Sequence, residues 1–153
     1  MRVRKQEGIE VLRTVWLFER CSKRELDALQ RIATPLDVPA GKVLTNEGEI
    51  GREFFVLVRG EAVATRGGVR LATVEAGSFF GEMALLDRRP RSATVTTTEP
   101  TTVLVIAAGA FNSLVGDMPS VDRKMLIVLA ERLRDVEARF VPAEERVTNP
   151  DLV

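Results

Sequence analysis

The sequence predicts a mainly β domain with helices before and after its strands. Between residues 35 and 108, short apolar segments alternate with turn residues at intervals of about 8–12 residues. On both sides of that region, apolar residues recur at the spacing of a helix. Many short strands separated by frequent turns are typical of sandwiches, barrels and jelly rolls. With 153 residues, 45% hydrophobic and 29% charged, the chain has the size and composition of one globular domain.

Residues 1–34 are expected to form an N-terminal helical segment. Four apolar residues recur there at helical spacing: Ile9, Leu12, Trp16 and Leu17. Ser22 and Glu25 match a capping box, in which each side chain accepts a hydrogen bond from the other residue's backbone N–H. We therefore expect two helices with a break near residues 18–21, the second of them ending near Ala33.

Residues 35–108 are expected to contain the strands. The continuous apolar run at 54–58 predicts a buried strand. Gly67-Gly68 is a hairpin signal, and Pro39-Ala40-Gly41 predicts a turn. Five further segments have the pattern of strands: 42–45, 62–65, 69–74, 92–98 and 101–107.

Residues 109–140 are expected to form C-terminal helices. A short helix should stop before Pro119, and a longer one should run from an N-cap at Ser120 to Phe140. Apolar residues on the longer helix follow a 3-4-3-4 spacing: Leu126, Leu129, Leu133, Val136 and Phe140. This stripe spans barely two heptads, so it fits packing on the domain itself as well as a homodimer through residues 120–140.

Composition narrows the classes of function. The absence of histidine excludes histidine-ligated metals and Ser-His-Asp or Cys-His catalysis, and we expect neither a catalytic nor a metal site. With 22 basic and 22 acidic residues the net charge is zero, which argues against a general attraction to nucleic acid. No apolar run approaches the ~20 residues of a membrane span, so a cytoplasmic location is expected. The single cysteine, Cys21, is expected to be buried, and the polar residues 141–153 to form a tail.

The segment FFGEMALLDRRPRSATV at 79–95 has the features of an anion-binding pocket. Gly81 allows tight backbone geometry, and a helical turn after it would present free N–H groups to an anion. Arg91, after Pro90 and before a strand, would direct its guanidinium at the same anion, and arginine pairs with phosphate bidentately. Glu82 accepts hydrogen bonds only, so it suits a hydroxyl beside the phosphate. A sugar hydroxyl next to a phosphate indicates a nucleotide.

Two motifs of this segment, FGEMAL at 80–85 and PRSATV at 90–95, closely resemble the phosphate-binding cassette of the cyclic nucleotide-binding domain family. The likeness covers about residues 15–140 and includes PAGKVLTNEGEIGREFFVLVRGEAVA at 39–64. Glycines stand at the family's turn positions: Gly41, Gly48, Gly51 and Gly60. The resemblance implies an eight-stranded, double-sheet jelly-roll barrel with N-terminal helices and C-terminal hinge helices. It also implies a cyclic nucleotide ligand and no further cofactor.

The resemblance assigns ligand contacts by position. Seven residues of the cassette are implied to bind: Gly81, Glu82, Met83, Ala84, Arg91, Ser92 and Ala93. Gly81 and Glu82 would hold the ribose 2′-hydroxyl, and the Ala84 backbone N–H would reach the cyclic phosphate. Arg91 would neutralise that phosphate, and Ser92 would add its backbone N–H.

The base would lie against residues outside the cassette. By position, Leu71 and Val74 line the base pocket, and an apolar residue of the last helix, Leu133 or Val136, would cap the base. Catabolite activators of the family read adenine with a Thr-Ser pair where this chain has Val136 and its neighbour, so that adenine contact does not carry over. Ser92 fits cAMP or cGMP, and we favour cAMP.

The resemblance favours a non-catalytic sensor. Ligand binding would move the C-terminal helices and signal to an effector protein or a second subunit. The alternative is a protein-interaction module of the same fold that binds no nucleotide. The 13 residues after Phe140 are too few for a helix-turn-helix domain, so we expect no nucleic-acid binding by this chain alone. The chain would be either a stand-alone domain or a piece of a longer protein. Arg88 and Arg89 are expected at a solvated loop tip.

Overall fold

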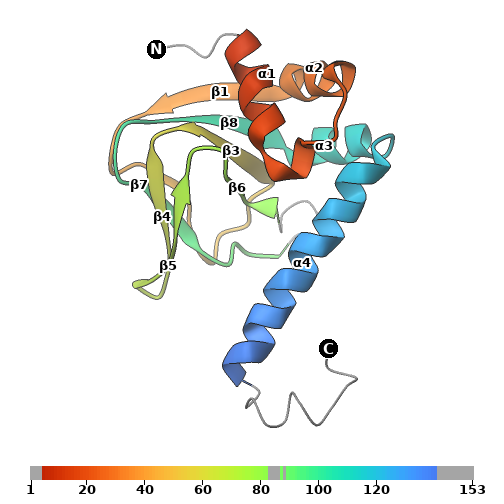
Figure 1. The fold of residues 1–153 in the computed structure, drawn as a ribbon. Coiled ribbons are helices and arrows are strands. Elements are labelled where there is room, and N and C mark those ends of the chain that lie inside the picture. The colour runs from red at the N-terminus through yellow and green to blue at the C-terminus, as the bar shows by residue number, and fades with distance from the viewer. Residues whose placement is uncertain (1–4, 83–86, 88, 141–153) are drawn as a thin grey trace, which may run out of the picture.

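The structure, a computed structural model, describes residues 5–82, 87 and 89–140 (Figure 1). Its N-terminal helices are α1 (Lys5–Thr14), η1 (Trp16–Phe18) and α2 (Lys23–Arg31). The predicted capping box is confirmed, because Ser22 Oγ accepts a hydrogen bond from Glu25 N at 3.1 Å and Glu25 Oε1 accepts one from Ser22 N at 2.8 Å. Helix α2 ends before the predicted Ala33, since that residue already begins the first strand.

The described residues form eight strands in two antiparallel sheets. Their bounds are β1 (Ala33–Val38), β2 (Val43–Thr45), β3 (Glu53–Arg59), β4 (Glu61–Arg66), β5 (Val69–Glu75), β6 (Phe79–Phe80), β7 (Thr94–Thr97) and β8 (Thr101–Ala107). One sheet has the order β1-β8-β3-β6 and the other the order β2-β7-β4-β5 (Figure 1). The predicted mainly β, double-sheet architecture with flanking helices is confirmed.

Two of these strands are not predicted by the sequence pattern. β6 has only two residues, too few for an alternation of apolar and polar side chains to appear. β1 contains Pro35, which normally argues against a strand. It is nevertheless compatible here, because β1 lies at the edge of its sheet, where a missing N–H leaves no ladder bond open.

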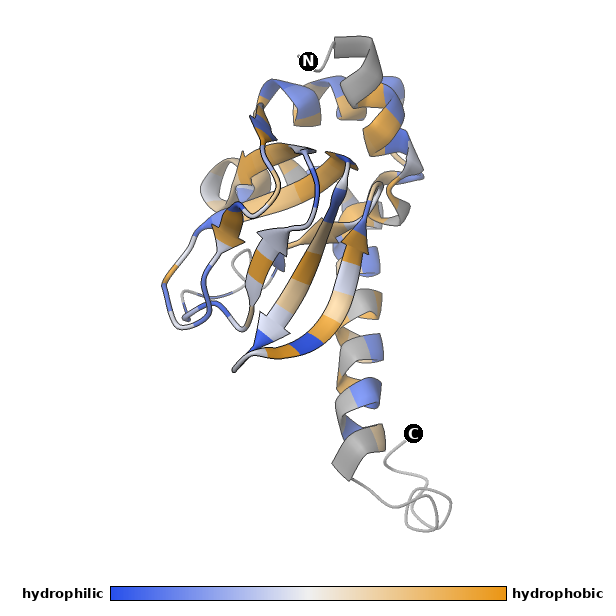
Figure 2. Ribbon diagram, turned by 90° about the vertical axis from the view of Figure 1, so that its left-hand side faces the viewer, coloured by the Kyte–Doolittle hydropathy of each residue, from blue (hydrophilic) through white to orange (hydrophobic). Residues whose placement is uncertain are grey.

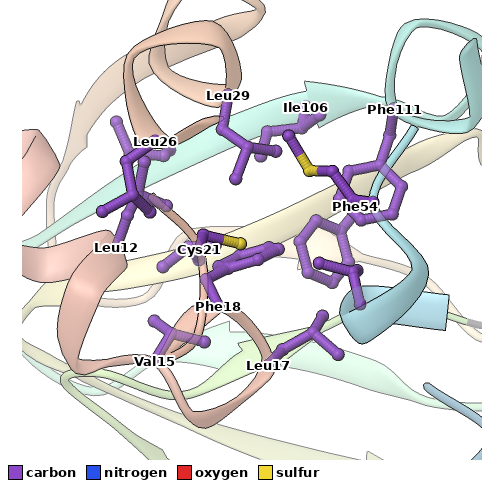
Figure 3. Packing of buried hydrophobic residues seen from close by; sticks show 14 of the residues in the cluster. Leu12, Val15, Leu17, Phe18, Cys21, Leu26, Leu29, Phe54, Ile106 and Phe111 are labelled. Carbon is purple, nitrogen blue, oxygen red and sulfur yellow. The ribbon is translucent and has the colours of Figure 1, made fainter. Parts of the chain in front are cut away.

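Strand β3 is buried on both faces, which explains its continuous apolar sequence. Alternate side chains enter two different clusters. Phe54, Val56 and Val58 pack with the helices, whereas Phe55 and Leu57 lie in a cluster to which both sheets contribute. Figure 3 shows the first of these, in which strands and helices both supply side chains: Leu12, Phe18, Leu26, Leu29, Phe54, Ile106 and Phe111. We call the two the helix-side cluster and the inter-sheet cluster.

Cys21 belongs to the helix-side cluster, as its predicted burial requires (Figure 3). Burial raises the pKa of the Cys21 thiol to about 11, and the Glu25 carboxylate adds to that rise. The thiol therefore stays neutral at physiological pH and acts as a small apolar group.

Two helices follow the last strand: α3 (Ala108–Val115) and α4 (Pro119–Phe140). The prediction of an N-cap at Ser120 is wrong, because α4 begins one residue earlier and Ser120 lies in its first turn. Proline suits that first position, since its φ is already helical and a helix leaves the first N–H groups without internal partners. None of the helices in the described ranges is both long and apolar enough to cross a membrane.

Helix α4 contacts the body of the protein mainly through its first turns. Lys124 Nζ forms an ion pair of 2.7 Å with Glu19 Oε1, just after η1. The C-terminal half of α4 projects beyond the strands (Figures 1 and 2). Leu126 and Leu133 are 68% and 59% exposed, so these two residues of the apolar stripe do not pack on the domain itself. The predicted tail at 141–153 lies outside the described residues.

Candidate functional site

Two aromatic residues in β6 anchor the start of the predicted pocket. The Phe80 ring stacks on Phe55 of β3, with centroids 4.8 Å apart and planes at 6°. Phe79 points to the other face of the sheet, where its ring centroid lies 5.6 Å from that of Phe54. The pair therefore inserts one ring into each hydrophobic cluster, which fixes the position of the next residue, Gly81.

Gly81 is required by its conformation and by its surroundings. Its φ is +82°, in the left-handed region that residues with a Cβ rarely adopt. A Cβ at this position would stand 2.8 Å from the Glu53 carbonyl oxygen and 3.0 Å from Arg91 Nη1. The missing side chain thus lets the backbone approach the Arg91 guanidinium closely.

The backbone of Arg91 is held by the loop after β2. Arg91 N donates to the Glu49 carbonyl at 2.7 Å, and Gly48 N donates to the Arg91 carbonyl at 2.9 Å. The preceding Pro90 pairs with Ile50 in an isolated bridge. Two separate chain segments, 48–50 and 90–91, therefore fix where the Arg91 side chain starts.

The Arg91 side chain is only 9% exposed. Its Nη2 donates to the Glu53 carbonyl at 2.9 Å and to the Glu53 carboxylate at 3.3 Å. Its Nη1 is buried and has no hydrogen-bond partner among the described residues. One arm of the guanidinium fork is therefore fixed by Glu53, while the other lies beside Gly81 and can bind an acceptor from outside the described residues.

The guanidinium packs against two further groups. A Cβ on Gly51 would stand 2.6 Å from Arg91 Cζ, so the guanidinium lies directly on the glycine backbone. Arg91 Cζ also lies 5.9 Å from the centroid of the Phe55 ring, within the range of a cation–π contact. Because Phe55 itself stacks on Phe80, the position of the cation depends on the same aromatic pair that positions Gly81.

The electrostatic setting of Arg91 favours an anion. Burial lowers the pKa of the Arg91 guanidinium, and the neighbouring Glu53 carboxylate opposes that effect. Arginine remains charged in proteins, so the site holds a partly desolvated cation. A cation removed from water interacts more strongly with an anion than an exposed one does.

Glu82 follows Gly81 and is almost completely buried, with 1% of its surface exposed. A buried carboxylate is costly unless hydrogen-bond donors surround it. A carboxylate oxygen can accept more than one hydrogen bond, so the group has capacity for a donor from a ligand as well as from the protein. The structure thus brings an acceptor and a cation to adjoining positions in the cassette.

The residues after Arg91 are held from both sides. The exposed Ser92 accepts a hydrogen bond at its carbonyl oxygen from Arg66 Nε, at 2.7 Å. The half-buried Ala93 accepts one at its carbonyl oxygen from Thr45 Oγ1, at 3.1 Å. The predicted contact residues at 91–93 therefore lie between β2 and β4, with a bend at Ser92.

The two residues predicted to line the base pocket have different surroundings. Val74 is buried in the inter-sheet cluster and pairs with Ala62 of β4. Leu71 is 39% exposed and falls where the pairing of β4 with β5 shifts register. An irregularity of this kind re-aims a side chain, so strand alternation alone does not fix the direction of Leu71.

The remaining predicted contacts are not tested by this structure. Leu133 is exposed on the projecting half of α4, and of Val136 only its place within α4 is described. Met83 and Ala84 lie outside the described residues. The proposed contacts of all four residues stay predictions.

Three residues that contact the site were not predicted from the sequence to do so: Gly51, Glu53 and Arg66. Gly51 was expected only at a turn, although its glycine identity was a usable signal. Glu53 and Arg66 carried no signal, because their contacts with Arg91 and Ser92 join positions that are 38 and 26 residues apart in the chain. Such contacts arise only when the sheets are assembled.

Known proteins share both the sequence pattern and the fold. A cyclic nucleotide-gated potassium channel of Rhizobium etli is 34% identical over 134 residues, which are 85% of this chain and 37% of the channel. The cAMP-bound structure of PfPKA-R superposes with a TM-score of 0.77 at 26% identity, covering 89% of this chain and 47% of the other. The Catabolite Activator Protein of Thermus thermophilus gives a TM-score of 0.74 at 28% identity, covering 81% and 61%.

The match to a family model agrees with these likenesses. The model of the cyclic nucleotide-binding domain matches residues 35–117, more than half of the chain. This range contains all eight paired strands except the first two residues of β1, together with Gly81, Glu82 and Arg91. The chain therefore belongs to the cyclic nucleotide-binding domain family.

Proposed function

We propose that this chain is a non-catalytic regulatory domain that binds a cyclic nucleotide, with cAMP favoured over cGMP. One observation carries the proposal: Arg91 Nη1 is buried beside Gly81 and has no hydrogen-bond partner in the described part of the chain. A buried donor of this kind is costly unless a ligand or water satisfies it. A cyclic phosphate supplies an anionic acceptor that matches the fork geometry of arginine.

The other cassette residues complete this assignment. Glu82, buried next to Gly81, would accept a hydrogen bond from the ribose 2′-hydroxyl. The phosphate would also receive the backbone N–H groups of Ser92 and Ala84. The base would extend over Leu71 and Val74, which lie on the neighbouring β5. Membership of the family and the likeness to a cAMP-bound relative support these roles.

Ligand binding would be coupled to the position of α4. In the structure this helix is tied to the N-terminal segment by the ion pair between Lys124 and Glu19, while its far half projects from the strands (Figure 1). Closure of α4 over the base, with Leu133 or Val136 as the cap, would favour one arrangement of the helix over the other. That change would be transmitted to an effector protein or, through the exposed residues of α4, to a second copy of the chain.

Calorimetric titration of the purified chain tests the nucleotide proposal. We expect cAMP to bind more tightly than cGMP, and 5′-AMP to bind poorly because its dianionic, acyclic phosphate has a different shape and charge. Arg91→Ala should weaken cAMP binding about 100-fold, since it removes a charge-assisted contact worth about 1.5–3 kcal/mol. Arg89→Ala is the matched control, because this exposed arginine lies in the same loop.

Two outcomes would contradict the proposal. If the wild-type chain binds none of the three nucleotides, the chain is better described as a protein-interaction module of the same fold. If Arg91→Ala and Arg89→Ala bind cAMP as tightly as wild type, the phosphate assignment is wrong. A thermal melt of each variant excludes unfolding as the cause of lost binding.

A further inference from the structure

The tip of the β4–β5 hairpin is bonded to the cassette. Arg66, the last residue of β4, donates from Nε to the Ser92 carbonyl at 2.7 Å. At the adjoining turn, Gly67 N donates to Glu47 Oε1 at 2.9 Å. The hairpin therefore reaches the residue directly after Arg91, although neither bond is needed to pair β4 with β5.

The bonds along 91–93 show which neighbours this segment contacts. Arg91 bonds to the loop after β2 through both its N–H and its C=O, and the Ala93 carbonyl bonds to Thr45 of β2. The chain bends at Ser92, and the Ser92 carbonyl is directed instead at Arg66 of β4. Arg66 is thus bonded to the same residue whose N–H we assign to the phosphate.

The alternation of side chains along β4 also indicates where the Arg66 side chain lies. Ala62 is buried in the inter-sheet cluster, and Ala64 packs against that cluster. These residues face the interior that also contains Phe55, the ring against which Arg91 packs. Arg66 is the next alternate position of the strand, at the exposed end. It therefore stands at the solvent-exposed end of β4.

Among the described residues, the Arg66 guanidinium is hydrogen-bonded only through Nε, to the Ser92 carbonyl. Its two terminal nitrogen atoms can therefore donate to another acceptor. The nearby carboxylate of Glu47 accepts from Gly67 N instead. The positive charge at this edge is therefore held in place by a neutral carbonyl.

We infer that Arg66, positioned by the Ser92 carbonyl, is a second cation for the anionic end of the ligand. The inference rests on the proposed function, and it adds a ligand-contacting residue from outside the cassette. Arg91 would bind the phosphate from its buried position, and Arg66 would attract it from the exposed end of β4. Its contribution is electrostatic, so it depends on charge and on ionic strength.

Three variants test this inference by calorimetry with cAMP. Arg66→Gln removes the charge and should weaken binding about tenfold, in the range of one charge-assisted contact. Arg66→Lys keeps the charge and should lose about threefold or less. Arg70→Gln is the matched control, because Arg70 is an exposed arginine of the same hairpin whose guanidinium bonds to Thr73, and it should bind like wild type. Raising the salt from about 0.05 to 0.5 M should weaken wild type more than Arg66→Gln.

The outcomes separate this inference from the proposal on which it rests. If Arg66→Gln binds like wild type while Arg91→Ala does not, Arg66 has no role in binding and the nucleotide proposal stands. If Arg66→Lys loses as much cAMP affinity as Arg66→Gln, and both have the same salt dependence, the inference is wrong. Arg66 then acts only by holding the Ser92 carbonyl through Nε. A wild-type chain that binds no cyclic nucleotide overturns both. Circular dichroism melts confirm that each variant is folded.

Discussion

The two ends of the proposed nucleotide pocket differ in how completely the protein builds them. At the phosphate end, Arg91 is 9% exposed, its backbone is bonded to the loop after β2, and glycines at 51 and 81 make room for its guanidinium. At the base end, Leu71 is 39% exposed and Leu133 is 59% exposed. Within the described residues, the phosphate end is buried and hydrogen-bonded, whereas these two residues assigned to the base end are exposed.

This difference suggests a division of labour. A preorganised phosphate end binds without much ordering cost, so it would supply most of the affinity. A base end that is completed by α4 would spend part of its binding energy on moving that helix. A ligand shifts a conformational equilibrium only by its difference in affinity for the two states, so the base end is where binding would be converted into a signal.

The largest effect expected at the phosphate end comes from Gly81→Ala. The new Cβ would collide with the Glu53 carbonyl and Arg91 Nη1 in a backbone conformation that alanine rarely adopts. We expect a loss of about 2–3 kcal/mol in the free energy of unfolding, together with loss of cAMP binding. Urea denaturation and calorimetry measure the two effects.

Gly41→Ala is the matched control for that substitution. Gly41 has the same φ of +82°, but nothing lies within 4 Å of a Cβ placed there. It should therefore show only the conformational cost of about 1 kcal/mol and retain cAMP binding. Equal costs at the two positions would mean that close packing around Arg91 does not matter.

A smaller effect, confined to the sugar, is expected for Glu82→Gln. Replacing the buried carboxylate by an amide removes a charge-assisted bond and should weaken cAMP binding about tenfold. The ligand 2′-deoxy-cAMP, which lacks the hydroxyl, should bind wild type weakly and the variant equally weakly. If the substitution weakens both ligands by the same factor, Glu82 does not read the 2′-hydroxyl.

The smallest effect is expected at the base end, for Leu133→Ala. Because this side chain is largely exposed, stability should change by no more than about 0.5 kcal/mol. If α4 closes over the base, cAMP affinity should fall about threefold, since part of an apolar contact is lost. Leu126→Ala, at another exposed position of the same helix, should leave affinity unchanged.

Leu133 and Leu126 also distinguish a base cap from a dimer seam. Sedimentation of both variants shows whether either leucine affects self-association. A parallel loss of dimer in both variants, with no change in cAMP affinity, would contradict the base-cap role and favour a homodimer through α4.

How far the sequence predicts this molecule depends on the range of each interaction. The Ser22 capping box and the buried strand at 54–58 were predictable, because each depends on a few neighbouring residues and a fixed period. The N-cap at Ser120 was wrong, since Pro119 is itself a suitable first helical residue. The two-residue β6 could not be found, because it exists only by pairing with β3.

The sequence by itself determined the mainly β architecture with its flanking helices and pointed to the family, because strand and turn patterns and the FGEMAL and PRSATV motifs are local properties of the chain. Only the tertiary structure decided that Arg91 is buried with Nη1 unpaired among the described residues, and that Gly51, Glu53 and Arg66 surround or extend its site. It also decided that α4 projects from the strands. The physical reason is that burial, desolvation and contacts between distant segments come into being only when the two sheets and the helices pack together.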